Sequence, residues 1–339
     1  VKVFDGVLKK GMAIKLMATK KKAEVVSLGV FAPMAKTTNQ LSAGEVGFVI
    51  PGLKDIKDTK IGDTITSEAE QVSIPLSGYK DAKPMVFCGL YPVDGSQFDF
   101  LRDSLEKLHL NDSSFVYEPE TSKALGFGFR CGFLGLLHME IVRERLEREY
   151  DLKLITTAPT VVYYAVTNRG EIIMVENPSN MPSPNELSVI KEPFIEATII
   201  TPIEFIGSII NLVQKRRGSQ KSLKYLNDNL VLLVYELPLN EMVFDFHDHL
   251  KSMSKGYASF DYEYLDYRPS KLMRLDILIN GDSVDALSII VHKEKAHYIG
   301  KELVKKMKHI IHRQMFEVVI QAVIGSKVIC RETVKALRK

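Results

Sequence analysis

The sequence has no tryptophan, only three cysteines and no long hydrophobic run. Cys88, Cys131 and Cys330 lie far apart, and their number and spacing exclude a disulfide framework and a cysteine-rich zinc site. The longest apolar runs are short pieces such as Val231–Tyr235, well below the ~18 residues needed to span a bilayer. No signal peptide is recognisable. These absences are typical of a globular protein in a reducing cytosol.

Motifs of common catalytic and nucleotide sites are also missing. No Gly-x-x-x-x-Gly-Lys-Ser/Thr phosphate loop, no Asn-Lys-x-Asp guanine motif and no Ser/His/Asp or Cys/His set occurs. The glycine-rich stretch Gly126–Gly135 has the wrong spacing for a nucleotide loop, and Arg130 is its only cation, so we favour a packing role. His138 lies at helical spacing with Val142 and Leu146, which indicates a packing histidine rather than a base.

Length and charge distribution indicate a multidomain protein with a basic end. The 339 residues predict two to four domains, and 45% hydrophobic and 26% charged residues are ordinary for a soluble chain. The net charge is only +3, but residues 270–339 hold 14 Lys and Arg against 7 acids, a net charge of +7, which leaves −4 for the rest. This asymmetry suggests a polyanionic partner at that end, although a solvated lysine-rich surface is equally compatible with charge alone.

Residues 1–77 have the pattern of an all-β domain. Short, partly alternating apolar runs such as Ala13–Met17 and Glu45–Ile50 are separated by turn signals such as Lys9-Lys10-Gly11. Many short strands with frequent glycines and no helical period predict a small β-barrel. The chain starts at Val1 rather than Met and enters strand-like alternation at once, so we expect a truncated first strand and a fragment of a longer protein.

Residues 83–166 change to a mixed pattern. Met85–Tyr91 is a predicted strand, and Asp94 is the predicted N-cap of a helix with apolar residues at helical spacing. Two more strands, a helix over about 135–149 with three Arg–Glu pairs at i,i+4, and a closing strand at Val161–Val166 follow. The resulting β-α-β-β-α-β order predicts a ferredoxin-like plait.

A second unit repeats this order after a break. Residues 167–192 contain three prolines within seven residues, which predicts a linker and a domain boundary. Residues 193–268 then show a strand, a helix expected to start at Thr201-Pro202-Ile203-Glu204 and stop at Gly218, two strands, a helix and a last strand. We therefore expect a multidomain α+β protein with one barrel, two ferredoxin-like plaits and a basic α/β C-terminal domain.

Residues 269–339 form that last domain, and a helix over about 295–315 is its most informative feature. One face of this predicted helix is apolar, and the residues on it are Ile299, Leu303, Met307, Ile310 and Gln314. The opposite face carries Lys301, Lys305, Lys308 and His312. A cationic ridge held by an apolar side suits RNA phosphates, and we favour this over a solvated face. A basic amphipathic helix can also lie on an anionic membrane.

Several stretches resemble translational GTPases. Val3–Gly11 and Leu41–Gly47 are similar to strands of their second-domain barrel, and Arg216-Arg217-Gly218 with Gly256–Phe260 resembles the fifth domain of elongation factor G. The basic end resembles the special C-terminal domain of the LepA family. The motifs that carry this second likeness are Asn280-Gly281-Asp282, Val284–Ser288, Ala296-His297 and Lys327–Thr333.

The resemblance implies a ribosome-bound GTPase that engages tRNA-loaded ribosomes and promotes back-translocation or the fidelity of protein synthesis. The partners that the resemblance implies are tRNA and the ribosome, with its RNA and proteins. The resemblance further implies a monomer in the cytoplasm that makes peripheral contact with the cytoplasmic face of the cell membrane. GTP and Mg2+ are implied for the full-length protein. Because residues 1–339 contain no guanine or phosphate motif, we expect no cofactor, no metal site and no GTP hydrolysis in this chain alone.

The predicted RNA- or ribosome-binding residues are basic residues of the second plait and of the basic domain. They are Lys215, Arg216, Arg217, His292, Lys293, Lys295, His297, Lys301, Lys305, Lys308, Arg313, Lys327, Arg331, Lys335 and Arg338. No catalytic residue is predicted. Two rivals stay open: a non-ribosomal module that uses its basic end on anionic membrane, and an enzyme that acts from the Gly126–Gly135 loop.

Overall fold

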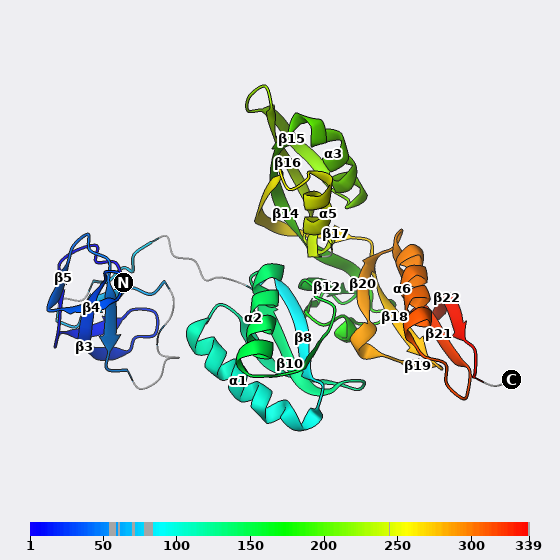
Figure 1. Cartoon of the computed structure of the whole chain (residues 1–339), viewed down its shortest axis with the longest axis horizontal. Helices are drawn as coiled ribbons and strands as arrows, with labels where there is room; N and C mark the ends of the chain where they lie inside the picture. Colours follow the sequence, from blue (N-terminus) through cyan, green and yellow to red (C-terminus); the bar gives the residue numbers. More distant parts are fainter. Residues whose placement is uncertain (54–58, 60–61, 70–71, 78–83, 244, 338–339) are drawn as a thin grey trace. The chain divides into compact units, whose positions relative to one another are not determined.

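The structure of the chain is a computed structural model. It describes residues 1–53, 59, 62–69, 72–77, 84–243 and 245–337. The chain divides into two compact units, residues 1–83 and 84–339 (Figure 1), and each is treated by itself below.

The first unit consists of short antiparallel strands in its described residues. They are β1 (Val7–Lys9), β2 (Ala13–Leu16), β3 (Lys22–Phe31), β4 (Ala35–Thr38), β5 (Gln40–Ser42), β6 (Phe48–Pro51) and β7 (Ile65–Ser67). β1 pairs with β5, and the other five strands form a second sheet around β3. Gly11 takes a positive φ of 79°, which allows the tight turn between β1 and β2. The predicted all-β character and the turn at Gly11 are confirmed.

The second unit begins with a four-stranded sheet covered by two helices. Its elements are β8 (Val86–Pro92), α1 (Phe98–Asn111), β9 (Val116–Ser122), β10 (Gly126–Phe133), α2 (Leu136–Glu149) and β11 (Leu154–Thr156). The strand order is β11-β8-β10-β9, with every neighbouring pair antiparallel. Leu101 and Leu105 of α1 and Val142 and Leu146 of α2 pack in one core with Phe129. Both helices therefore lie on the same face of this sheet (Figure 1).

The glycine-rich stretch is part of strand β10, and its glycines serve packing. A Cβ atom on Gly132 would lie 2.6 Å from the Phe87 ring, and one on Gly128 would lie 2.5 Å from the Leu90 carbonyl oxygen and also clash with Tyr91. Glycine is therefore required where bulky side chains of β8 cross the neighbouring strand. The predicted packing role of the stretch is confirmed.

The strand expected at Val161–Val166 belongs to the next sheet, so its assignment to the plait of residues 83–166 was wrong. The edge beside β8 is taken by β11, which follows α2 after only four residues and pairs Leu154 with Pro92. A single bridge between Phe87 and Thr160 continues that edge. The chain then leaves the sheet, and β12 (Tyr163–Thr167) pairs with β13 (Ile172–Val175) and β14 (Leu187–Pro202).

The second sheet is built around the long strand β14. Its further elements are α3 (Ile206–Lys215), β15 (Ser219–Tyr225), β16 (Leu230–Pro238), α4 (Asn240–Val243), α5 (Phe246–Met253) and β17 (Ser259–Ser270). β17 runs along one side of β14, while β12 and β16 pair with successive parts of the other side. Ile195, Ile199, Ile209 and Val213 lie in its hydrophobic core. Leu136 packs against both this core and that of the first sheet.

Residues 167–192 are not the loop that their prolines predicted. They contain β13 and the first six residues of β14, and both strands belong to the second sheet. Pro178 occupies the first turn of a short 3-10 helix whose preceding Asn177 side chain accepts the Ser179 N–H at 2.9 Å. Pro178 and Met181 are buried. Proline and asparagine here form an ordered turn rather than a linker.

The ends of α3 also differ from the expected caps. Thr201 belongs to β14 and does not cap the helix, which follows a 3-10 turn at Ile203–Phe205 with no side-chain cap. At the other end, Arg217 rather than Gly218 takes the left-handed conformation, with a φ of 60°. The N–H of Gly218 donates to the Val213 carbonyl at 2.9 Å and closes the helix.

The basic end forms a third sheet covered by one helix. Its elements are β18 (Leu272–Ile279), β19 (Asp282–Ser283), β20 (Ile289–His292), α6 (Ala296–Ile310), β21 (Val318–Ile324) and β22 (Lys327–Val334). The order is β19-β18-β21-β22, and β20 pairs with the other end of β18. The helix ends five residues earlier than predicted, and β22 was not predicted as a strand.

Candidate RNA-binding surface

The buried side of α6 is set by small residues. Ala296, Gly300 and Val304 are buried, and a Cβ atom on Gly300 would lie 3.1 Å from Ile329 Cδ1 and 3.2 Å from Ala322 Cβ. The helix therefore approaches β21 and β22 closely at this point. Ile310 was expected on the apolar face but is 73% exposed. The line of buried residues along α6 is displaced by one residue from the position of Ile310.

The cationic side of α6 faces solvent next to β22. Lys301, Lys305 and Lys308 are exposed, and Lys308 Nζ forms an ion pair with Glu332 Oε2 at 2.6 Å. This hydrogen bond and the charge of Lys308 lower the pKa of the Glu332 carboxyl. Ion pairs this exposed contribute little to stability, so Lys308 can exchange its partner for a phosphate at small cost. The structure thus places all three lysines on one accessible ridge.

The predicted cations of β22, and Lys335 directly after it, do not join that ridge. Lys327, Arg331 and Lys335 are exposed. Glu332 points toward α6, and side chains alternate along a strand, so Arg331 lies on the opposite face of the sheet. Arg338 lies outside the described residues. Arg313 is exposed in the segment between α6 and β21.

The segment before α6 and the first turn of this helix together contribute four of the predicted residues. His292 is half-buried at the end of β20, and Lys293 and His297 are exposed. Lys295 precedes the first turn of α6, and its Nζ donates to Glu241 Oε2 at 2.8 Å and to the Lys215 carbonyl at 2.9 Å. This segment therefore contacts the end of α3 directly.

The cations at the end of α3 differ sharply in their surroundings. Lys215 is exposed, whereas Arg217 holds two carboxylates. Its two terminal nitrogens donate to Glu192 at 2.6 and 3.0 Å, and its Nε donates to Glu241 Oε1 at 2.7 Å. Glu192 is completely buried. The RNA-binding role of Arg217 and Lys295 stays a prediction, but both side chains are already engaged with acids of the same chain.

The pKa values in this cluster follow from those pairs. Burial by itself would raise the pKa of the Glu241 carboxyl, but hydrogen bonds from Lys295 and Arg217 outweigh it and hold the pKa below its ordinary value. The same acids raise the pKa of Arg217 against the opposing effect of burial. Glu241 and Arg217 are therefore both charged at neutral pH.

Two of the three predicted groups of basic residues lie together, because Lys295 contacts the end of α3. The third group, at β22, does not join them. Residues 215–217 and 292–297, some 80 positions apart, meet through Lys295. The ridge of Lys301, Lys305 and Lys308 continues from the same helix start. The β22 cations stand apart, as described above.

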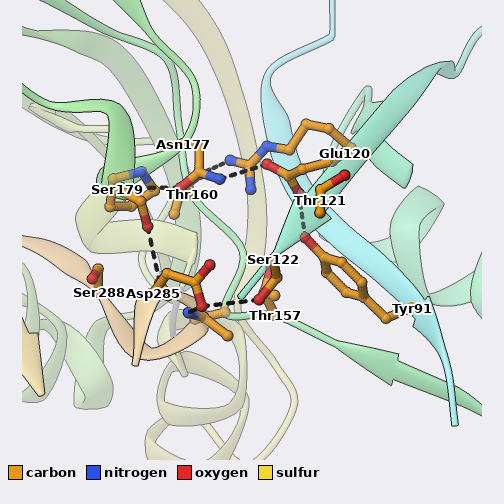
Figure 2. A pocket seen from close by; sticks show the side chains of 14 residues that line it. Tyr91, Glu120, Thr121, Ser122, Thr157, Thr160, Asn177, Ser179, Asp285 and Ser288 are labelled. Carbon is orange, nitrogen blue, oxygen red and sulfur yellow. Dashed lines mark hydrogen bonds between the residues drawn. The ribbon is translucent and has the colours of Figure 1, made fainter. Parts of the chain in front are cut away.

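A small polar pocket lies away from this surface and was not anticipated from the sequence (Figure 2). Ser122 Oγ donates to Asp285 Oδ1 at 2.9 Å, and Tyr91 OH donates to Glu120 Oε2 at 2.7 Å. Arg130, 94% buried, donates to Thr160 Oγ1 at 2.8 Å and to the Glu176 carbonyl. These residues come from parts of the chain more than 160 positions apart, so no local pattern could reveal them.

Within the described residues, no group of three or more metal-ligating side chains comes together. The same residues contain no helix that is both long and apolar enough to cross a membrane. His138 accepts the Leu134 N–H at 3.1 Å through Nδ1 and contacts Asp112 Oδ2 at 2.9 Å through Nε2. The interpretation of His138 as a packing histidine fits these contacts.

Three parts of the chain are similar to known protein families. Residues 1–66 match the family model for elongation factor Tu domain 2. Residues 189–278 match the model for the elongation factor G C-terminus, and residues 279–339 match the model for the C-terminus of GTP-binding protein LepA.

The whole chain is also similar to curated proteins. It is 53% identical over all 339 residues to an elongation factor 4 of Sorangium cellulosum (strain So ce56). It is 55% identical over the same length to an elongation factor 4 of Desulfitobacterium hafniense (strain DSM 10664 / DCB-2). The alignments cover 56% of each relative, so the chain spans about half the length of these proteins.

Proposed function

We propose that this chain, which belongs to the elongation factor 4 (LepA) family, is the ribosome-binding part of a translation factor. The observation that carries the proposal is identity above 50% over every residue of the chain to relatives named elongation factor 4. The match of residues 279–339 to the LepA C-terminus supports the assignment of the basic end. Ribosomal RNA, ribosomal proteins and tRNA are the partners that follow.

The finer architecture belongs to the same proposal. We infer that the first unit is a translation-factor barrel and that the sheets around β8 and β14 are ferredoxin-like plaits. The chain order β-α-β-β-α-β and the strand orders β11-β8-β10-β9 and β17-β14-β16-β15 support the second point.

In the proposed mechanism this chain binds and positions, and does not catalyse. The exposed lysines of α6 would displace counterions from RNA phosphates, and Lys215 and Arg216 would extend that contact to the second plait. GTP binding and hydrolysis, with Mg2+, are proposed for the whole protein in the cytoplasm. For residues 1–339 we propose no GTPase activity, since the guanine and phosphate motifs are absent from the sequence.

Replacing Lys301, Lys305 and Lys308 together by Glu tests the proposed RNA contact. Each lost phosphate contact should reduce the log–log salt slope by somewhat under one unit, so binding to tRNA-loaded ribosomes should weaken and its slope should flatten by about two to three units. Folding should survive, because exposed substitutions typically cost within ~0.5 kcal/mol each. The measurements are co-sedimentation with ribosomes at several salt concentrations and thermal melts by circular dichroism.

A matched control replaces Lys20, Lys21 and Lys22 of the first unit by Glu. It introduces the same change of charge in a run that carries no amphipathic ridge. Unchanged affinity and slope in a normally folded α6 variant would contradict the RNA contact. Preferential binding of the parent chain to anionic vesicles over ribosomes would contradict the function itself.

A further inference from the structure

Four ionisable side chains join the end of α3 to the start of α6. They are Glu192, Arg217, Glu241 and Lys295. Two are acids and two are bases, so their formal charges cancel. Lys295 Nζ contacts both carboxylate oxygens of Glu241, at 2.8 and 3.0 Å, and is the cluster's link to α6.

Arg217 is held firmly by its acidic partners. Its side chain is 18% exposed, its backbone is left-handed, and its guanidinium uses all three nitrogens on Glu192 and Glu241. A non-glycine residue keeps this backbone conformation only when its surroundings compensate the strain. Turning Arg217 toward a phosphate would leave the buried Glu192 without its counter-ion.

Lys295 is in a similar position at the surface of the cluster. Its side chain is 32% exposed, but its ammonium group already has three acceptors on the α3–α4 side. The exposed cations on either side of this four-residue cluster are not part of it. Lys215 precedes it on α3, and Lys301 and Lys305 follow it on α6.

We propose that Arg217, Glu241 and Lys295 are positioning residues, which fix α6 relative to α3 and thereby set the spacing between the exposed cations of the two helices. The proposal rests on the proposed function in one respect: RNA is the ligand whose binding depends on the distance between these cations. Phosphates of a folded RNA lie at fixed separations, so cations that are already correctly spaced lose less conformational entropy on binding. Breaking the ion pairs of this cluster should therefore weaken RNA binding without removing a phosphate contact.

The spacing itself can be measured without RNA. Spin labels at Ser208→Cys on α3 and Lys306→Cys on α6, both exposed positions, report the distance between the helices when Cys330 is replaced by Ser. We expect a narrow distance distribution in the parent chain and in Lys295→Arg, which keeps the donor. Lys295→Met and Glu241→Gln should broaden it, and Lys301→Met, the control on the same helix, should not.

Measurements of ribosome binding then distinguish a positioning role of Lys295 from a direct contact with phosphate. Lys295→Met should weaken binding to tRNA-loaded 70S ribosomes by between about 2-fold and 30-fold, the range for changes that disturb coupling between sites. Its salt slope should stay at the parent value, and Lys295→Arg should restore the affinity. Lys301→Met should instead lower the slope by ~0.7–0.9, the value for one phosphate contact.

Two results would overturn the inference: an unchanged distance distribution in Lys295→Met, or a salt slope in that variant that falls as in Lys301→Met. Failure of the parent chain to bind ribosomes would refute the proposed function, while the label distances would still decide the positioning role. Lys295→Met and Glu241→Gln carry the test because both keep Arg217 as the counter-ion of the buried Glu192, whereas loss of Arg217 threatens folding.

Discussion

Arg217 combines a left-handed backbone with a bidentate bond to a buried carboxylate, and this makes it a residue of large expected effect. Replacing Arg217 by Met leaves Glu192 buried and uncompensated, which should lower the free energy of unfolding by about 3–5 kcal/mol. Arg216→Met is the control, because the Arg216 guanidinium donates a single hydrogen bond of 3.4 Å within the described part of the chain, to the Glu241 carbonyl. Equal destabilisation of both variants in urea unfolding would contradict this account.

The cluster also predicts how stability depends on pH. The folded-state pKa of Glu241 lies below its ordinary value of 4.5, so its ion pairs stabilise the fold above that value. This stabilisation is lost as the pH falls from about 4.5 through the depressed pKa. Unfolding free energies measured between pH 7 and pH 3 should therefore fall less steeply in Glu241→Gln than in the parent, by at most ~1.4 kcal/mol per pH unit for one proton. Parallel curves would show that Glu241 does not titrate in this way.

At the scale of elements, strand β10 depends on its glycines. A Cβ atom at Gly128 meets the Leu90 backbone and the Tyr91 ring, neither of which can move without disturbing β8. We expect Gly128→Ala to lower the free energy of unfolding by at least the ~1–3 kcal/mol typical of overpacking. Gly207→Ala in α3 is a matched control, since nothing lies within 4 Å of the added atom, and it should stabilise by about 0.5–1 kcal/mol. A tolerated Gly128→Ala in chemical unfolding would refute the packing role.

Helices with strong local periodicity were predicted well, and their ends were predicted poorly. Leu101, Leu105 and Leu108 are fully buried on α1 as their spacing indicated. By contrast, α6 stops at Ile310, and Ile311 takes an extended conformation although the polar–apolar pattern continues. The pattern records which side of a helix would be buried, but the point where the chain turns toward β21 depends on the sheet beneath it.

At the scale of the whole second unit, Asp285 attaches the C-terminal sheet to the turn between β9 and β10. Its carboxylate accepts the Ser122 hydroxyl at 2.9 Å (Figure 2). It also accepts the Lys123 N–H at 2.8 Å. Asp285→Ala should therefore remove two to three hydrogen bonds and speed hydrogen exchange at the Lys123 amide. The free energy of unfolding should fall by at most about 1.5–3 kcal/mol for each charge-assisted hydrogen bond that is lost. Asp282→Ala, an exposed residue nearby in sequence, is the control. Unaltered exchange at Lys123 in Asp285→Ala would show that this contact does not hold the two parts together.

Much of this protein followed from the sequence alone: the all-β start, the helical stripes, the packing role of Gly126–Gly135, and the cationic ridge of α6. These features depend on neighbours within a few residues, so periodicity and turn chemistry report them. The family likeness likewise rests on local motifs such as Asn280-Gly281-Asp282.

Only the tertiary structure decided which strand lies beside which and which cation is already paired. Tyr163–Thr167 has an ordinary strand pattern, yet it joins β14 because β11 reaches the edge of β8 first. Arg217 and Lys215 look alike in sequence, but Arg217 meets Glu192, 25 residues away, and Lys215 remains exposed. Strand pairing and ion pairing depend on residues far apart in the chain, and no local pattern specifies which of several compatible partners comes within reach.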